Sequence, residues 1–285
     1  MKKIKLYSLI TVFAIGAFYT SDFWKNGNES FGDELFNETK DITKSINTTE
    51  ADSWNINNDD QLLRQKYSDN THEQLLQRTG YIVSYNKDTK LPNWVAWHLT
   101  PDRISGPVKR SGIDFEPDLD VPAPRAEDSD YYGSGYDRGH MCPAADNKFS
   151  KKAMQESFLF TNMCPQNSNL NRGDWNEMEM ACRDWAQKYG SVYVVCGPIL
   201  YKGKHKTIGK NRVVVPEAFF KVVLRTGENP NAIGFIYKNT EGNRPKGDYV
   251  NTVDEVERIT GIDFFPSLPD NIEDKIEAKA DIADW

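Results

Sequence analysis

Apolar side chains recur every three or four residues between Asp174 and Tyr189, and this spacing constrains the fold of the chain more than any other feature. The repeating positions are Trp175, Met178, Cys182, Trp185 and Tyr189. An α-helix completes a turn in about 3.6 residues, so side chains at this spacing line up on one face. The sequence therefore predicts a helix over 174–189 that packs this stripe against a core.

Short apolar runs before and after that helix predict β-strands. The two earlier runs, 81–85 and 94–99, are separated by a polar turn over 86–90. The later runs span 191–196, 212–215, 219–224 and 232–237. Further helices are predicted over 150–157 and, behind the capping box Thr252-x-x-Glu255, over 253–260. Because the strands occur in runs instead of alternating with helices, the pattern favours an α+β fold around a mostly antiparallel mixed sheet.

The N-terminus has the features of an export signal. Lys2, Lys3 and Lys5 precede an apolar run from Leu6 to Tyr19. A run of about 14 residues is shorter than the roughly 20 that a transmembrane helix needs. We expect residues 1–21 to be a signal peptide or, since no clean cleavage site follows, an uncleaved N-terminal anchor; a buried helix is the third alternative. An exported protein, periplasmic or secreted, is therefore expected.

The charge distribution divides the rest of the chain. Residues 22–72 carry five bases and eleven acids with few apolar positions, which predicts a polar, acidic extension or linker. Residues 269–285 are interpreted as an acidic C-terminal tail, and residues 73–268 as the folded domain. The formal net charge of -7 argues against a nucleic-acid partner. Residues 73–266, however, are neutral overall, so composition does not exclude a local basic site.

The four cysteines raise the question of a metal site or a disulfide framework. Cys142, Cys164, Cys182 and Cys196 contain no C-x-x-C pair, which disfavours zinc. Cys182 lies on the apolar stripe and Cys196 ends a predicted strand, so free buried thiols are one interpretation. An even count also permits three disulfide pairings, among which the sequence does not choose.

Three motifs stand in order along the middle of the chain. The first is Tyr136-Asp137-Arg138-Gly139-His140, the second contains Asn162 and Pro165-Gln166, and the third is Leu170-Asn171-Arg172-Gly173-Asp174-Trp175. Glu179 and Arg183 follow one helical turn apart on the predicted helix. On that helix alone, the spacing of Glu179 and Arg183 favours an ordinary surface ion pair over a pair of cleft residues.

Taken together, these motifs resemble the DNA/RNA non-specific endonucleases with a ββα-metal site. The resemblance runs from about Arg78 to Leu268 and implies a ββα finger from the strand of His140 to the helix of Glu179. It implies that His140 is a general base activating water, as suits a neutral imidazole. It further implies that Asn171 is the direct ligand of a hydrated Mg²⁺, with Mn²⁺ or another hard divalent cation possible, and that Glu179 holds metal-bound waters.

The resemblance also implies phosphate-binding residues. Arg138 and Arg183 are the expected phosphate clamps, because a guanidinium pairs bidentately with phosphate oxygens. Arg110 is a further candidate, although its spacing to the following aromatic residue differs slightly from the family pattern. Asn162 is expected at the site, but an Asn here could equally fix a turn. Asp137 is expected to orient its loop by hydrogen bonds, and Asn171 has the alternative of capping the next helix.

A basic segment over 201–212 is either a solvated loop or an edge that follows a nucleic-acid backbone. The sequence thus predicts an endonuclease acting on DNA and RNA, with no stable protein partner implied. A narrower nucleotide phosphodiesterase on the same fold is one alternative. An exported, non-catalytic nucleic-acid-binding module is another, although the presence of every motif residue argues against a decayed site.

Overall fold

The computed structural model of the protein describes residues 59–67, 71–240 and 242–285. Within these residues, the largest sheet has seven strands in the order β12-β11-β10-β7-β4-β3-β2, and every neighbouring pair is antiparallel. The strands are β2 (Gln74–Gln77), β3 (Ile82–Asn86), β4 (Leu91–Leu99), β7 (Val192–Ile199), β10 (Ala218–Arg225), β11 (Asn231–Lys238) and β12 (Val250–Asn251). The predicted α+β fold with a mostly antiparallel sheet is confirmed.

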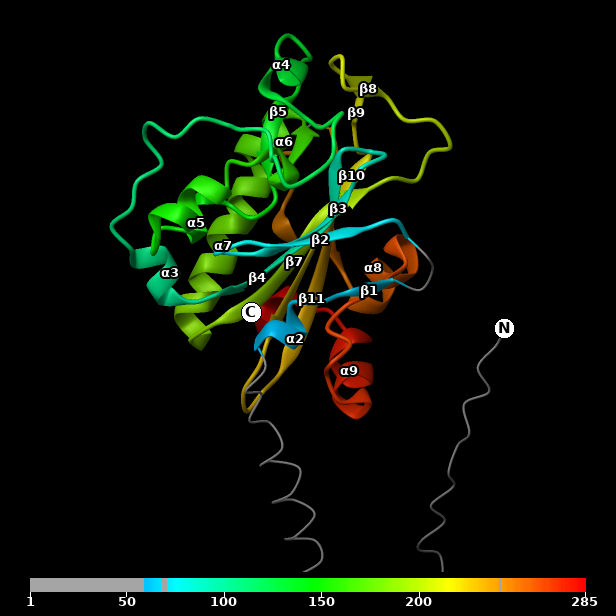
Figure 1. Ribbon diagram of the computed structural model, residues 1–285. Helices are drawn as coiled ribbons and strands as arrows, with labels where there is room; N and C mark the ends of the chain where they lie inside the picture. Colours follow the sequence, from blue (N-terminus) through cyan, green and yellow to red (C-terminus); the bar gives the residue numbers. More distant parts are fainter. Residues whose placement is uncertain (1–58, 68–70, 241) are drawn as a thin grey trace, which may run out of the picture. The chain divides into compact units, whose positions relative to one another are not determined.

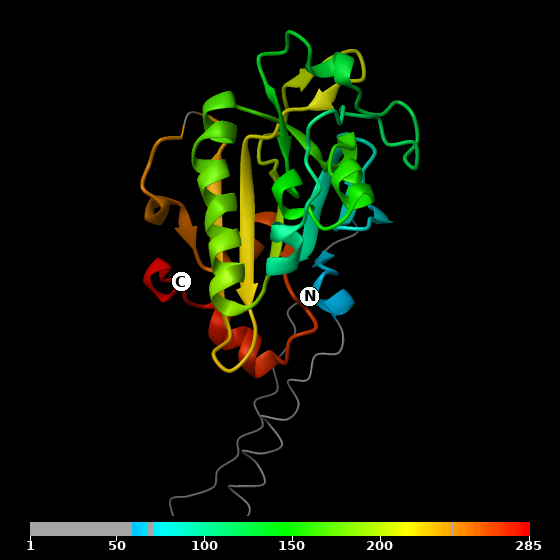
Figure 2. The same ribbon diagram turned by 90° about the vertical axis from the view of Figure 1, so that its left-hand side faces the viewer.

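Helices cover both faces of this sheet (Figures 1 and 2). Helix α7 (Asp174–Tyr189) crosses one face and contacts β4 and β7. On the other face, α8 (Val253–Thr260) contacts β10 and β11, and α9 (Asp270–Glu277) contacts β11. The core therefore lies in two layers, one on each side of the sheet.

The apolar stripe of α7 packs on the sheet as the sequence predicts, and the helix spans the predicted residues. Trp175 lies against Phe219 of β10, with ring centroids 5.6 Å apart, and Trp185 stacks on Phe235 of β11. Both tryptophans are buried. Burying each such aromatic side chain contributes about 2–3 kcal/mol, so this interface fixes α7 firmly on the sheet.

Shorter elements complete the fold. Two further small sheets pair β5 (Asp137–His140) with β6 (Met163–Gln166) and β8 (Thr207–Ile208) with β9 (Val213–Val214). The short helices are α2 (Asp59–Leu62), α3 (Pro101–Ser105), α4 (Asp128–Tyr131), α5 (Lys151–Glu156) and α6 (Ser168–Arg172). Single 3₁₀ turns span Ala144–Asp146, Phe160–Asn162, Lys246–Tyr249 and Ile282–Asp284.

Most predicted elements lie within a few residues of the observed ones, and α8 begins behind the Thr252 cap as expected. The Thr252 hydroxyl accepts a hydrogen bond from the backbone N–H of Glu255 at 3.2 Å. The run over 212–215 behaves differently, because only Val213–Val214 form a strand and they pair with β8 outside the large sheet. A run of so few residues does not reveal its partner.

The folded domain begins earlier than residue 73. Helix α2 buries Leu62, and the next strand, β1 (Lys66–Tyr67), pairs with β13 (Ile262–Asp263). The buried amide of Gln65 accepts a hydrogen bond from the backbone N–H of Phe265 at 2.8 Å. The predicted polar extension is therefore wrong for residues 59–67, where a few apolar positions meet the far end of the chain. The remainder of the extension up to residue 58, and the predicted signal or anchor over 1–21, lie outside the described residues.

The C-terminal segment is part of the domain and not a free acidic tail. Residues 270–277 form α9, and Trp285 lies 7% exposed with its ring centroid 4.8 Å from that of Trp185. Lys188 Nζ donates a hydrogen bond to the carbonyl of Trp285 at 2.8 Å. The acidic composition of this segment does not indicate that it packs on the domain. The free energy gained by burying one tryptophan is enough to hold the segment there, because its carboxylates can remain in solvent.

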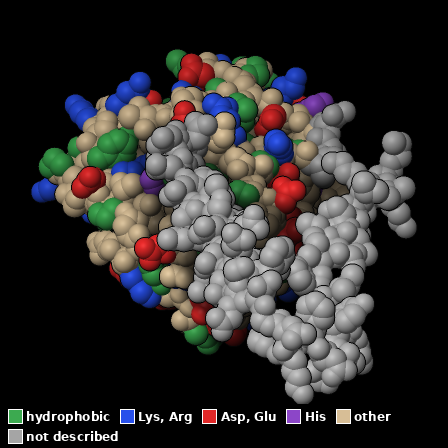
Figure 3. All heavy atoms as spheres, turned by 90° about the horizontal axis from the view of Figure 1, so that it is seen from below, with side chains coloured by type: hydrophobic (Ala, Val, Ile, Leu, Met, Phe, Trp, Pro, Cys, Tyr) green, Lys and Arg blue, Asp and Glu red, His purple; other side chains and the backbone are tan. Residues whose placement is uncertain are grey.

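The surface and the thiols add two observations. Seen from the end where α9 lies, acidic and basic side chains are interspersed on the described surface (Figure 3). Within the described part of the chain, no helix is both long and apolar enough to span a membrane. The four cysteines lie in that part, and all are buried and free of disulfides. Burial raises the pKa of the Cys142 and Cys182 thiols to about 12, so both are inert.

The docking of the C-terminal segment can be tested with Trp285→Ala. This change removes the ring packed on Trp185 and should lower the free energy of unfolding by about 3 kcal/mol, measured by urea denaturation. Leu119→Ala, at a position that is 79% exposed, serves as the control and should change it by less than about 0.5 kcal/mol. Equal stability of the two variants would contradict the packing described.

Candidate active site

A cleft of about 990 Å³ is lined by the loop 106–110, β5, α6 and α7. In Figure 1, β5 and α6 lie next to each other at one end of the domain, and α7 extends from there along the sheet. Six of the seven site residues predicted from the sequence line this cleft: Arg110, Arg138, His140, Asn171, Glu179 and Arg183. Residues separated by more than seventy positions thus converge on one hollow of the surface.

His140 ends β5, which pairs with β6 in an antiparallel hairpin. Its ring packs edge-on against Phe158, with centroids 5.1 Å apart, and is tilted against Phe115 at 5.6 Å. The Nε2 atom is buried without a hydrogen-bond partner, which leaves Nδ1 as the ring nitrogen available to the cleft. Burial, together with the charge of Arg110, lowers the pKa of His140 to about 3. The imidazole is therefore neutral at physiological pH.

The first motif requires a glycine at position 139. Gly139 pairs with Cys164 across the hairpin, and a Cβ at this position would overlap the side chain of Gln166. Gln166 is fully buried, so it has no room to move aside. Glycine between Arg138 and His140 thus lets β5 and β6 approach closely.

Asn171 lies within α6, two residues before Gly173, where α6 meets α7. A Cβ on Gly173 would lie 2.7 Å from the carbonyl oxygen of Asn169, so glycine permits the turn between the two helices. The Nδ2 atom of Asn171 donates a hydrogen bond to Asp137 at 3.1 Å. Among the described residues no group donates to its amide oxygen, and Asn171 does not cap α7.

Asp137 connects the hairpin to α6. Its carboxylate accepts hydrogen bonds from Asn171, from the Ser168 hydroxyl at 2.8 Å and from Arg172 at 3.0 and 3.2 Å. Partial burial raises the pKa of Asp137, but the hydrogen bonds from Asn171, Ser168 and Arg172 outweigh it, so the pKa lies below its usual value. The carboxylate therefore stays charged and holds the Asn171 amide in one orientation.

Glu179 lies on α7, half-buried at the floor of the cleft. Burial raises its pKa to about 7, and the charge of Asp146 adds to this, whereas Lys221 and Arg183 oppose it. A carboxylate in this setting gains a neighbouring cation readily, because a positive charge offsets the cost of burying the negative one.

Arg183 pairs with a residue that the sequence did not suggest. Its Nη1 donates to the buried carboxylate of Asp146 at 2.9 Å, and the Trp97 indole N–H donates to the other oxygen at 3.1 Å. Within the described residues no ion pair joins Arg183 to Glu179. The surface ion pair considered from the sequence is therefore absent. Arg183 is instead held by its ion pair with the buried Asp146 while it lines the cleft.

Arg138 and Arg110 are supported by aromatic rings. The guanidinium of Arg138 lies 5.5 Å from the ring centroid of Phe115, and its Nε donates to Asp128 at 2.6 Å. The guanidinium of Arg110 lies over Phe158, 5.4 Å from its centroid. The same two rings that pack on His140 thus support both cations of this wall.

Asn162 does not reach the cleft. It is fully buried, its amide oxygen accepts a hydrogen bond from the backbone N–H of Cys142, and its Nδ2 donates to the carbonyls of Cys142 and Ser157. Every polar atom of the side chain is used in fixing the backbone that follows His140. The alternative considered from the sequence, a residue that fixes a turn, describes its position better than a catalytic contact.

Several residues of the site carry no clear sequence signal. Lys109, Lys148 and Arg172 add positive charge to the lining of the cleft. The buried ammonium of Lys221 on β10 lies 4.0 Å from the ring centroid of Trp175 and makes no hydrogen bond with any residue that the structure describes. A lysine inside an apolar strand gives no indication of its surroundings. The cluster of Lys148 with residues of the loop 106–110 depends on tertiary packing alone.

The basic segment over 201–212 lies outside the lining of the cleft. Lys210 pairs with Glu127 at 3.5 Å, and Lys206 Nζ lies 4.8 Å from the ring centroid of Tyr136. Asn211 donates from both its backbone and its side chain to the buried carboxylate of Asp130. This loop is therefore anchored to the segment before β5.

Comparison with known proteins agrees with this arrangement. A family model described as DNA/RNA non-specific endonuclease matches residues 58–271. The chain is 37% identical over 212 residues to the mitochondrial nuclease EXOG of Xenopus laevis, covering 67% of this chain and 58% of the relative. It is 35% identical to human mitochondrial endonuclease G over 215 residues, 68% of this chain and 70% of that one. A solved complex of EndoG with EndoGI superposes with a TM-score of 0.67 at 29% identity, covering 71% of this chain and 89% of the other.

The antiparallel sheet, the β5–β6 hairpin and the cleft on α7 define a nuclease-type α+β domain. The chain belongs to the DNA/RNA non-specific endonuclease family, as its motifs suggested. It spans 58% of the length of the EXOG relative.

These relatives overturn one expectation. Both the Xenopus and the human relative are named as mitochondrial nucleases, so the prediction of an exported, periplasmic or secreted protein is wrong. The apolar run over 6–19, on which that prediction depended, lies outside the described residues. Basic residues before a short apolar stretch are not specific enough to identify a compartment.

The close approach at Gly139 can be tested by stability. Gly139→Ala places a methyl group against the buried Gln166 and should lower the free energy of unfolding by about 1–3 kcal/mol in chemical denaturation. Gly203→Ala is the matched control, because an added Cβ there has no neighbour within 4 Å. If both variants unfold at the same denaturant concentration, the hairpin does not require glycine.

Proposed function

We propose that this protein is a divalent-metal-dependent endonuclease that hydrolyses phosphodiester bonds in DNA and RNA without sequence specificity. The observation that carries the proposal is the convergence of His140, Asn171 and Glu179 with three arginines on one cleft. Family membership supports the reaction class. The catalytic domain would extend over residues 59–285, because both the first described helix and the C-terminal segment pack into it.

His140 would act as the general base. A base must be unprotonated before it can take a proton, and the low pKa of about 3 keeps this imidazole neutral. The rings of Phe115 and Phe158 fix its orientation, and the Trp175 indole N–H donates to the His140 carbonyl at 3.2 Å. Nδ1 would then accept a proton from the attacking water at the mouth of the cleft.

The donor set fits a hydrated hard cation. Within the described residues, the amide oxygen of Asn171 accepts no hydrogen bond, and the amide nitrogen is held by its hydrogen bond to Asp137. Glu179 is a half-buried carboxylate that a cation would return to its charged form. Asn171 would bind Mg²⁺, or Mn²⁺ or a similar divalent ion, directly, and Glu179 would hold its waters. Such an ion, when bound, supplies positive charge to the phosphate and to the leaving oxygen.

The arginines would bind the phosphate. Arg138 and Arg183 each use one side of the guanidinium on a carboxylate, Asp128 and Asp146, which leaves other N–H groups for phosphate oxygens. Arg110 on the loop 106–110 would contact a neighbouring phosphate. Six basic side chains against two carboxylates, Asp137 and Glu179, line the cleft of a chain whose net charge is -7. The basic character is therefore concentrated where the polyanion would lie.

The proposal is tested by incubating the protein with supercoiled plasmid and with single-stranded RNA, each with Mg²⁺ or with EDTA. Cutting of both substrates that stops in EDTA is the expected result. Cutting of mononucleotide esters alone would indicate the narrower phosphodiesterase. Binding without cutting would indicate a non-catalytic module, and either result would overturn the proposal.

His140→Ala should reduce the rate of plasmid cutting by about 10²-fold or more, because a positioned general base contributes a factor of about 10² to 10⁴. Substrate binding and the thermal unfolding temperature should change little. His72→Ala, whose side chain is 75% exposed and pairs only with Asp88, is the control and should retain the wild-type rate. A His140 variant within threefold of wild type would mean that another group activates the water.

The two proposed metal-binding residues should respond differently to replacement. Asn171→Ala should abolish the Mg²⁺-dependent rate, whereas Glu179→Gln should weaken activation by about 10- to 100-fold and be partly rescued by more Mg²⁺. Asn176→Ala, which removes another amide from the same cleft, should stay within about threefold of wild type. Full Mg²⁺-dependent activity in Asn171→Ala would contradict the assignment.

The pH dependence gives a separate test of Glu179. Its pKa of about 7 means that the carboxylate is charged only above that pH, so at low Mg²⁺ the rate should rise as the pH increases through 7. More Mg²⁺ favours the charged form and should shift this rise to lower pH. Glu179→Gln should lack the transition. His140 does not produce it, since its pKa of about 3 lies far below this range.

A further inference from the structure

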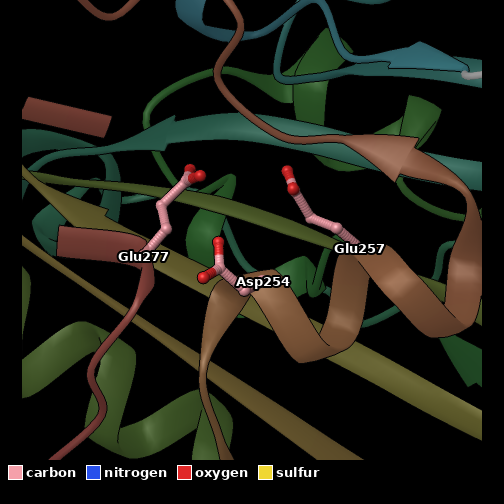
Figure 4. Close-up of side chains that lie close together, drawn as sticks. All are labelled: Asp254, Glu257 and Glu277. Atoms are coloured by element: carbon pink, nitrogen blue, oxygen red, sulfur yellow. The ribbon is translucent and has the colours of Figure 1, made fainter. Parts of the chain in front are cut away.

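Three carboxylates gather on the opposite face of the sheet from α7. Asp254 and Glu257 lie in the first and second turns of α8, and Glu277 is the last residue of α9. In Figure 4 their carboxylate groups point toward the same small space between the two helices. One oxygen of each lies within 4.8 Å of the others.

Glu277 is the most unusual member of this cluster. The residue is 3% exposed, and its Oε1 atom is buried with no hydrogen-bond partner among the described residues. Glu257, by contrast, uses Oε1 to accept a hydrogen bond from the backbone N–H of Phe264 at 2.7 Å. A buried carboxylate oxygen that accepts no hydrogen bond and faces two other carboxylates lacks a positive partner.

The surroundings of Glu277 raise the free-energy cost of leaving its carboxylate without a positive partner. Burial raises its pKa to about 9, and the charged groups that act on it, Glu257, Glu273, Asp254 and Asp263, are all carboxylates that raise it further. The C-terminal end of a helix also disfavours a negative charge, because the peptide dipoles point their negative ends there. A cation in the shared space would satisfy this group in its charged form.

We propose that Asp254, Glu257 and Glu277 bind a Ca²⁺ ion that joins α8 to α9. Calcium takes oxygen ligands at about 2.3–2.6 Å, so two ligands on opposite sides of the ion are separated by about 4.6–5.2 Å. Oxygens that all lie within 4.8 Å of one another are close enough to share one such ion. Mg²⁺ requires ligands at about 2.0–2.1 Å and gives up its waters reluctantly, so it suits these oxygens less well.

This site is separate from the proposed catalytic one. None of the three carboxylates lines the cleft, and the family match ends at residue 271, before Glu277. The ion would tether the C-terminal segment, whose Trp285 docks on α7, to the first turn of α8. Its predicted effect is on stability, so its test does not depend on nuclease activity.

The experiment measures thermal unfolding of the full chain after removal of metals with EDTA and dialysis. All proteins carry Asn171→Ala, so that an ion in the cleft cannot account for the result. Millimolar CaCl₂ should raise the unfolding temperature of this background by about 5 °C, and MgCl₂ at the same concentration by much less. Calorimetric titration with CaCl₂ should show one site.

Glu277→Gln keeps the shape of the side chain and removes its charge. It should abolish the Ca²⁺-dependent rise and unfold in EDTA at nearly the same temperature as the background, because without an ion the raised pKa of about 9 already keeps the Glu277 carboxyl uncharged at neutral pH. Asp254→Asn should also lose the rise. Asp274→Asn, an exposed carboxylate on the same helix and outside the cluster, is the matched control and should keep it.

Three results would overturn the proposal. The first is an unfolding temperature of the background that Ca²⁺ leaves unchanged, which would mean that the cluster holds protons instead of an ion. The second is a rise that persists in Glu277→Gln, which would place the ion elsewhere. The third is an equal rise with Mg²⁺, which would contradict the argument from ionic size.

Discussion

The arrangement of the site depends on the carboxylate of Asp137. It lies at the start of β5 and accepts hydrogen bonds from three residues of α6, including the amide of Asn171. The strand that ends in His140 and the helix that presents Asn171 are therefore held together by one charged group. Because its hydrogen bonds keep that group ionised, the distance between the two functional residues is fixed before any substrate or ion arrives.

The sequence predicted those parts of the fold that depend on local patterns. The stripe on α7, the Thr252 cap of α8 and the long apolar strands were all readable, because each reflects periodicity or a hydrogen bond between near neighbours. The packing of the two ends of the domain could not be predicted from the sequence. Gln65 bonds to Phe265, and Trp285 docks on Trp185, in regions whose polar composition suggests solvent. Contacts between distant segments leave no local pattern.

In the site, too, residues in local motifs could be predicted, whereas residues that act through contacts between distant segments could not. Six of the seven residues predicted for the site from the sequence line one cleft. Two buried groups behind them could not be found: Asp146, which pairs with Arg183, and Lys221, which lies against Trp175. Each acts through a neighbour in another element, 37 and 46 positions away in the chain. Asn162 was placed at the site by its motif, but its amide is fully used on the backbone near Cys142. A motif identifies a position and does not say which way the side chain faces.

Strands β4 and β7 are direct neighbours in the sheet, although residues 100–191 separate them in the chain. Every residue of the cleft, from Gly106 to Arg183, lies in this one excursion. Pairing of the two central strands must therefore close a very long loop, and the entropy cost of such closure grows with loop length. Folding of the scaffold and assembly of the catalytic segment are consequently coupled, and such non-local pairing favours slow folding.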